Sequence, residues 1–171
     1  MAPAPREAAG PSGSRLDDLY DLLTAAPDEA RAAEVRRLID RARMVSGSAT
    51  ADLLVARAAV AERAGESGLA LDLLDAAIVV APRWAGGLRL RGLLQVRRGA
   101  TASGAVDLTA ALRLDPRDGA ALAVLAGLAE LDGRKREALD LLKRARAVDP
   151  NEERLRESIE RLTLEVEGRP L

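Results

Sequence analysis

Three arginines, Arg63, Arg89 and Arg97, have the side chains best suited to binding a ligand. A guanidinium group presents a planar fork of N–H donors that matches both oxygens of one carboxylate. If the three groups share one surface, they would clamp an acidic partner. Each could equally form an ordinary ion pair with an Asp or Glu on a helix surface, where such pairs contribute little. The residues alone leave both interpretations open.

The aromatic side chains are confined to Trp84 and Tyr20. Trp84 follows Pro82 and Arg83, so it lies at a break between two helical segments. An aromatic residue there could anchor a ligand, or it could fill the space between two packed helical units. Tyr20 has the same two possible roles near the start of the chain.

The residue types argue against catalysis. The chain contains no Cys and no His, so it lacks soft metal ligands and any group that titrates near neutrality without a perturbed pKa. Its glycines recur at a fixed spacing, as turn residues do, and form no phosphate-binding loop. We therefore expect a protein that is not an enzyme and that uses no cofactor and no metal.

The overall charge is balanced. The chain has 26 basic and 27 acidic residues, which gives no field for a polyanion or an acidic membrane surface. Aromatic residues make up 1% of the chain, too few for the stacking platforms of nucleic-acid binders. No apolar run approaches the roughly 18 residues of a membrane span. The sequence predicts no nucleic-acid partner and no direct membrane insertion.

A period of 34 residues organises the chain from Ala51 onward. Four columns of identical residues define it: Pro82, Pro116 and Pro150; Gly65, Gly99 and Gly133; Leu74, Leu108 and Leu142; and Ala77, Ala111 and Ala145. A glycine midway and a proline at the end are typical of a helix, a turn, a second helix and a stop. The period predicts three units, 51–84, 85–118 and 119–152.

Segments of different character flank these units. Residues 1–14 are rich in Ala, Pro, Gly and Ser, which favours a flexible tail. Residues 15–50 read as a helical hairpin that starts at a Ser14 cap and covers one end of the stack. Residues 153–171 read as a capping helix and a C-terminal tail, with Leu155, Ile159 and Leu162 on one face. We expect nine helices in all.

The three units resemble tetratricopeptide repeats. The first unit matches the pattern of that family at Leu54, Ala58, Ala70, Leu74, Ala77 and Pro82. The large aromatic positions of the family are missing, and Arg57 and Arg91 stand where a leucine is expected. The resemblance implies an all-α fold, a right-handed α-α superhelical solenoid of helical hairpins.

The resemblance also implies where partners bind, because the first helix of each repeat lines the concave side in this family. A helical projection that turns Leu54, Ala58 and Ala61 inward leaves other residues facing the groove. The predicted partner-binding residues are Val55, Ala59, Arg63, Trp84, Arg89, Leu93, Arg97, Ala123, Gly127 and Leu131.

These expectations favour a protein–protein interaction adaptor or scaffold that holds a partner peptide or helix in the groove, with the chain itself a monomer. The alternative is a structural or assembly subunit of a larger complex, or a homo-oligomer, that uses its convex face or its end helices. The composition suggests a bacterial source. The protein would be periplasmic if "MAPAPREAAG" is the remainder of a processed export signal, and cytoplasmic otherwise.

Overall fold

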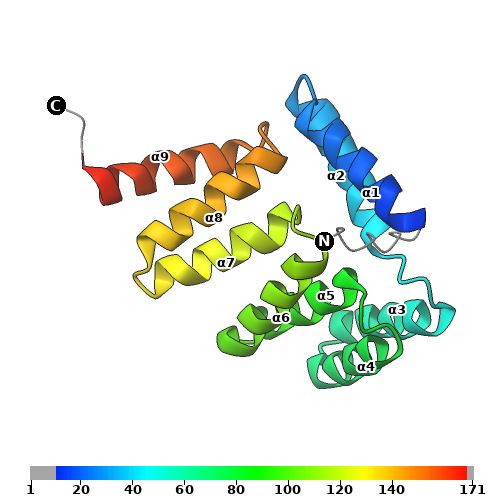
Figure 1. The fold of residues 1–171 in the computed structure, drawn as a ribbon. Coiled ribbons are helices and arrows are strands. Elements are labelled where there is room, and N and C mark those ends of the chain that lie inside the picture. Colours follow the sequence, from blue (N-terminus) through cyan, green and yellow to red (C-terminus); the bar gives the residue numbers. More distant parts are fainter. Residues whose placement is uncertain (1–10, 169–171) are drawn as a thin grey trace, which may run out of the picture.

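The computed structural model describes residues 11–168, and this part of the chain consists of nine helices and their connections (Figure 1). The helices are α1 (Pro11–Thr24), α2 (Glu29–Arg43), α3 (Ala49–Arg63), α4 (Ser67–Val80), α5 (Ala85–Arg97), α6 (Thr101–Leu114), α7 (Gly119–Leu131), α8 (Lys135–Val148) and α9 (Glu153–Glu167). The all-α prediction is confirmed.

Glycine turns close the hairpins α3/α4, α5/α6 and α7/α8. Gly65, Gly99 and Gly133 have φ values of +79°, +83° and +76°, in the left-handed region where a side chain is strained. In each turn the N–H of the next residue donates to a carbonyl five residues back, as in Glu66 N to Ala61 O at 2.9 Å. This bond satisfies one of the last carbonyls of the first helix.

Successive hairpins stack into a curved solenoid, with α4 packed on α5, α6 on α7 and α8 on α9 (Figure 1). Small residues allow the close approach. A Cβ on Gly104 of α6 would lie 2.5 Å from Val96 Cγ2 and 2.7 Å from the carbonyl oxygen of Gly92 on α5. The backbones of α5 and α6 therefore nearly touch, and this close packing takes the place of the large aromatic side chains that the family pattern has and this chain lacks.

The final helix, α9, covers the end of the stack. Leu155 and Leu162 are buried against α8, in an apolar cluster that also holds Leu139 and Leu142. These two α9 residues lie 34 residues after Ala121 and Leu128 of the third repeat, so the period extends into α9. The helix α9 therefore occupies the place of the first helix of a fourth repeat.

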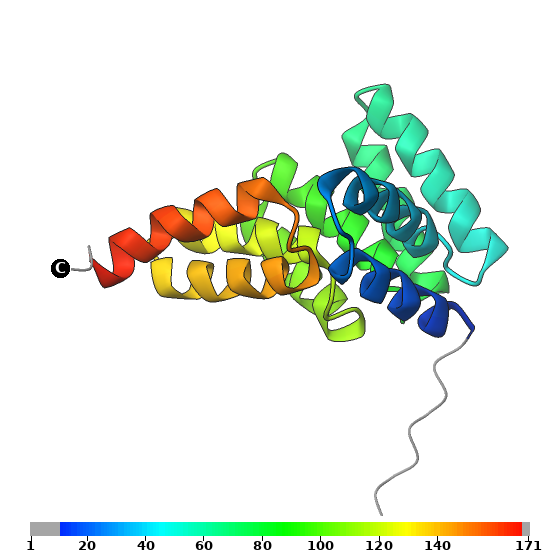
Figure 2. The same ribbon diagram turned by 90° about the horizontal axis from the view of Figure 1, so that it is seen from above.

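The start of the chain differs from the prediction in two respects. The helix α1 begins at Pro11, so Ser14 lies inside it rather than at its cap, and only residues 1–10 of the predicted tail fall outside the described residues. The hairpin α1/α2 does not cover the end of the stack at α3. It lies along the edge formed by the connections between repeats, with α1 packed on α8 (Figures 1 and 2).

The position of this hairpin has a physical cause. Val148, at the end of α8, belongs to the apolar cluster of Tyr20, Leu23, Val35 and Ile39 inside the hairpin. Thr24 Oγ1 also donates to the Val148 carbonyl at 3.0 Å. Burial at the repeat edge thus replaces the predicted stacking on α3.

Candidate functional site

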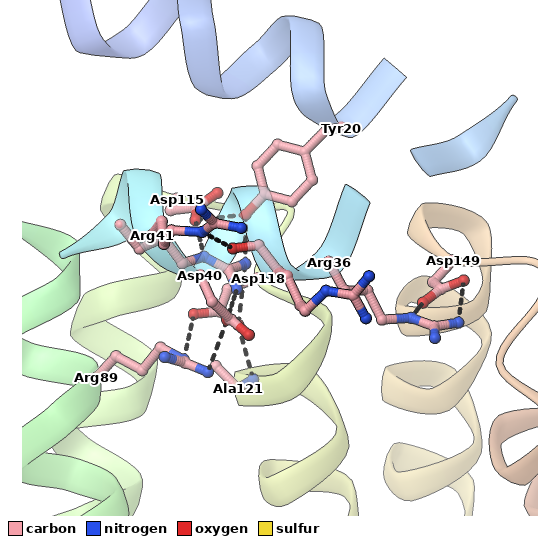
Figure 3. A network of polar contacts seen from close by, with 11 residues as sticks. Tyr20, Arg36, Asp40, Arg41, Arg89, Asp115, Asp118, Ala121 and Asp149 are labelled. Carbon is pink, nitrogen blue, oxygen red and sulfur yellow. Dashed lines mark hydrogen bonds and ion pairs between the residues drawn. The ribbon is translucent and has the colours of Figure 1, made fainter. Parts of the chain in front are cut away.

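Two arginines on α2, Arg36 and Arg43, fasten the hairpin to successive repeat joints, which are the connections between one repeat and the next. Figure 3 shows Arg36 beside Asp149. Asp115 and Asp149 occupy the same repeat position, directly before a proline. Arg43 Nε lies 3.3 Å from Asp115 Oδ2, and Arg36 donates to both oxygens of Asp149, with Nη2 to Oδ1 at 3.2 Å. The arginines are seven residues apart, two helical turns or about 10 Å, which matches the usual distance between packed helices.

Tyr20 completes this joint from α1. Its hydroxyl donates to Asp115 Oδ2 at 2.6 Å and accepts from Arg43. The guanidinium carbons of Arg43 and Arg117 lie 5.4 and 4.8 Å from its ring centroid, within range of a cation–π interaction. Burial, above all, raises the pKa of Tyr20 well above its ordinary value of 10, so the hydroxyl remains a donor.

Trp84 holds the end of α2 at the first joint, the connection between α4 and α5. Its Nε1 donates to the carbonyl oxygen of Arg43 at 2.8 Å. Gly86 leaves room for this contact, because a Cβ there would lie 2.3 Å from the same oxygen. Asp118, the counterpart of Trp84 in the next repeat, lies 3.2 Å from Arg43 Nη2. The connections between repeats thus form one continuous surface against which the hairpin packs.

A cleft of about 550 Å³ opens between α2, α7 and the start of α9. Its wall includes Leu23, Ile39, Val148 and Leu155, together with Arg89 and Arg154. Its floor is the first half of α7, where Gly119, Ala120 and Ala123 present no large side chain. The cleft combines apolar walls, five arginines against three acidic residues, and a floor that allows close approach.

A second cleft, of about 730 Å³, lies beside the other half of α7. Val96 of α5 and Arg161 of α9 form its walls, and Gly127 and Leu131 contribute from α7. Positions 120, 123, 127 and 131 follow one face of a helix. We call the surface floored by Ala120, Ala123, Gly127 and Leu131 the α7 groove.

Ion pairs fix the wall of the groove on α9. Arg161 donates to both oxygens of Glu130, at 2.6 and 3.0 Å, and Lys135 Nζ lies 2.8 Å from Glu165. The hydrogen bond from Arg161 lowers the pKa of Glu130, and that from Lys135 lowers the pKa of Glu165. On the opposite wall, Arg89 Nε lies 3.1 Å from Asp118 Oδ2.

The structure brings together some of the predicted site residues. Arg89 and Ala123 line the first cleft, and Gly127 and Leu131 line the second. Leu93 is half-buried on α5, between the positions of Arg89 and Val96.

Three predicted residues lie elsewhere on the surface. Arg97 is exposed and pairs with Glu62, with Nη2 to Oε1 at 3.2 Å. Ala59 and Arg63 are exposed on α3 and line neither cleft.

The placement of Val55 and Trp84 in the groove is wrong. Their exposed fractions are 4% and 8%, and both belong to the apolar cluster between the first two repeats. Val55 shares this cluster with Leu90 and Leu94 of α5, although the projection had turned it outward. Trp84 fills the joint, which was the other interpretation of this residue.

The sequence analysis missed the residues that fasten the hairpin. Arg36 and Arg43 resemble any surface arginines in the sequence, and their partners are 113 and 72 residues away. One signal was present: an Asp precedes the repeat proline at Asp115 and at Asp149. Because an aspartate recurs at the connections between repeats, it predicts that the element packed along these connections carries basic residues at a matching spacing.

Comparison with known proteins agrees with this architecture. No protein-family model matches the chain. A TPR repeat-containing protein of Rhizobium etli is 28% identical over 163 residues, which cover 95% of this chain and 80% of the relative. The solved structure of MamA from AMB-1 superposes with a TM-score of 0.61 at 18% identity, over 91% of this chain and 85% of that chain.

The fold defines the class of a helical-repeat solenoid. With its period of 34 residues, the chain is similar in sequence to the TPR repeat-containing relative and in fold to MamA. This fold supports a general role in protein–protein interaction, typically without catalysis, and the relative indicates a bacterial origin. No helix among the described residues is long and apolar enough to cross a membrane.

Proposed function

We propose that the chain is an adaptor that holds a segment of a partner protein in the α7 groove. The observation that carries this proposal is the small-residue floor of the two clefts. No atom lies within 4 Å of the position that a Cβ on Gly127 would take, and Ala120 and Ala123 add only methyl groups. A partner backbone or helix can therefore approach α7 closely and bury apolar area there.

The chemistry of the walls suggests what the partner presents. Leu23, Ile39 and Leu155 offer apolar contact in the first cleft. Arg154 also lines this cleft and forms no ion pair with any residue between 11 and 168. An apolar segment that carries a carboxylate would satisfy both features, because a guanidinium binds a carboxylate through two donors.

A photo-crosslinking experiment tests this proposal. A photoreactive amino acid is placed at Leu131, in the groove, or at Val79 on α4, and the protein is irradiated in the cell that produces it. The two positions are matched controls because their exposed fractions are 84% and 81%. We expect a discrete adduct from position 131 and none from position 79.

A blocking variant makes the experiment specific. Gly127→Leu places a side chain in the open space above α7, so it should abolish the adduct from position 131, while the helical circular dichroism stays near that of the parent and the unfolding midpoint does not fall. Equal adducts from positions 79 and 131, or an adduct that persists with Gly127→Leu, would show that the groove is not the binding site.

A further inference from the structure

The outer side of α3 carries an unpartnered surface that is separate from the α7 groove. We define the α3 face by Leu53, Arg57 and Val60. The 34-residue period gives each of them a counterpart in every later repeat and in α9: Gly87, Ala121 and Leu155 for Leu53; Arg91, Leu125 and Ile159 for Arg57; and Leu94, Leu128 and Leu162 for Val60. The later repeats therefore show what normally covers this face.

In the second repeat the counterpart face is buried against the preceding helix, α4. Leu94 is only 2% exposed and shares an apolar cluster with Leu71 of α4. A Cβ on Gly87 would lie 3.3 Å from Ile78 Cγ1.

The charged position of that joint is satisfied as well. Arg91 Nη1 donates to Asp75 Oδ1 of α4 at 2.8 Å, while its other nitrogens donate to Asp107 at 2.6 and 2.7 Å. The helix α4 thus offers α5 an apolar residue, an acid four residues later and an apolar residue three residues after that: Leu71, Asp75 and Ile78.

The α3 face has no such cover. Leu53 and Val60 are 60% and 57% exposed, and Arg57 is exposed with no ion pair to any residue in the described part of the chain. The α1/α2 hairpin, which precedes α3 in sequence, lies on the joint edge and leaves this face open. Each repeat of a solenoid needs a neighbour to bury its apolar side, and here one is missing.

We propose that the α3 face docks a helix of a partner protein with the character of α4: Leu or Ile at positions i and i+7 around an Asp or Glu at i+4. The apolar residues would cover Leu53 and Val60, and the carboxylate would pair with Arg57 as Asp75 pairs with Arg91. Charge complementarity and the covered counterpart at the next joint select this occupant. The proposal concerns a different surface from the α7 groove and does not depend on it.

A peptide probe tests the α3 face on the full-length chain. The probe is a fluorescent, helix-stapled peptide with the sequence of residues 67–80, in which Ala70, Leu74 and Ala77, which pack inside the hairpin, are replaced by glutamine. Fluorescence anisotropy should show saturable binding to the chain. Val60→Glu should weaken binding by about tenfold or more, because it places a charge against apolar surface.

A charge exchange identifies the contact. Arg57→Asp should weaken binding of the probe by about tenfold, and a probe with Asp75→Arg should recover affinity for that variant. Val106→Glu on α6, a similarly exposed valine, and Gly127→Leu in the α7 groove should bind the probe like the parent. Failure of the groove experiment would therefore leave this result unchanged.

Three results would overturn the proposal. They are no saturable binding, equal binding by Val60→Glu, or charge exchange without recovery. A fourth would replace the occupant: if sedimentation shows that the chain is a dimer and that Val60→Glu makes it a monomer, the α3 face docks a second copy and not a partner helix.

Discussion

At the scale of single residues, Tyr20 and Trp84 matter because they join parts of the chain that are distant in sequence. The residue types predicted two possible roles for each, ligand anchor or packing. The choice depended on partners 95 and 41 residues away, Asp115 and the carbonyl of Arg43. Neither aromatic residue recurs with the 34-residue period, so the sequence could not decide between the roles.

Replacing Tyr20 with Phe should lower the free energy of unfolding by about 1–3 kcal/mol, because it removes the donor to Asp115 and leaves buried charged groups short of a partner. Urea denaturation followed by circular dichroism measures the change. Phe preserves the ring and its contacts with the two arginines, so the loss reports on the hydroxyl. A change within a few tenths of a kcal/mol would contradict this role.

The raised pKa of Tyr20 predicts an alkaline limit to stability. An unfolded tyrosine ionises near pH 10, whereas the folded protein keeps Tyr20 neutral to higher pH. The stabilisation is therefore fully present below about pH 10 and is lost as the pH rises above it.

Absorbance at 295 nm reports this directly, because Tyr20 is the only tyrosine. We expect the folded protein to form no tyrosinate at pH 10.5, and tyrosinate to appear together with the loss of helical circular dichroism. Ionisation with a midpoint near pH 10 while the helices remain intact would show that Tyr20 is not buried in solution.

At the scale of the elements, the sequence predicted the repeat helices well because glycine and proline act locally. Their turns and stops depend on backbone geometry that a few residues determine. Helix faces were harder: Val55 was placed outward because the projection centred on Leu54, whereas the buried residues of α3 are Ala51, Val55, Ala58 and Ala61. In a helix rich in alanine, small apolar residues occur on every side, so the sequence pattern does not determine which face of the helix is buried.

Two glycines test the packing of the elements as a matched pair. Gly104→Ala should destabilise the protein by about 1–3 kcal/mol, because the new Cβ would lie 2.5 Å from Val96 Cγ2 and 2.7 Å from the Gly92 carbonyl oxygen. Gly127→Ala should stabilise it by about 0.5–1 kcal/mol, because alanine favours the helix and nothing lies within 4 Å. Thermal unfolding of both variants measures the difference. Effects of the same sign would contradict the close approach of α5 and α6.

At the scale of the whole molecule, the period predicted the stack, and the chain order suggested a hairpin at its end. The hairpin lies along the joints because Arg36 and Arg43 meet an acid at each of two repeats and because Val148 completes its apolar cluster. This arrangement leaves the α7 groove and the α3 face open. The groove could be predicted in outline from Gly127 and Leu131, whereas its wall on α2 could not.

Removing Arg43 should release the hairpin. Arg43→Met leaves Asp115 buried without its cation and Asp118 with Arg89 alone, at a cost of about 3–5 kcal/mol. We expect amide hydrogen exchange to accelerate in α1 and α2, while the amides of α7 and α8 keep most of their protection. Arg41→Met, on the exposed side of the same helix, serves as the control. Uniform acceleration along the chain would instead mean that the molecule unfolds as one unit.

The central claim is the position of the hairpin, because it determines which surfaces of the solenoid are free. A comparison of two spin-label distances tests it. The chain has no cysteine, so spin labels can be attached at Leu22→Cys with Ala147→Cys, beside the contact of Thr24 with Val148, or at Leu22→Cys with Leu53→Cys on α3. Double electron–electron resonance spectroscopy should give a narrow, short distance between the labels of the α1–α8 pair and a longer distance between those of the α1–α3 pair. The reverse order would place the hairpin on the end of the stack and contradict the account.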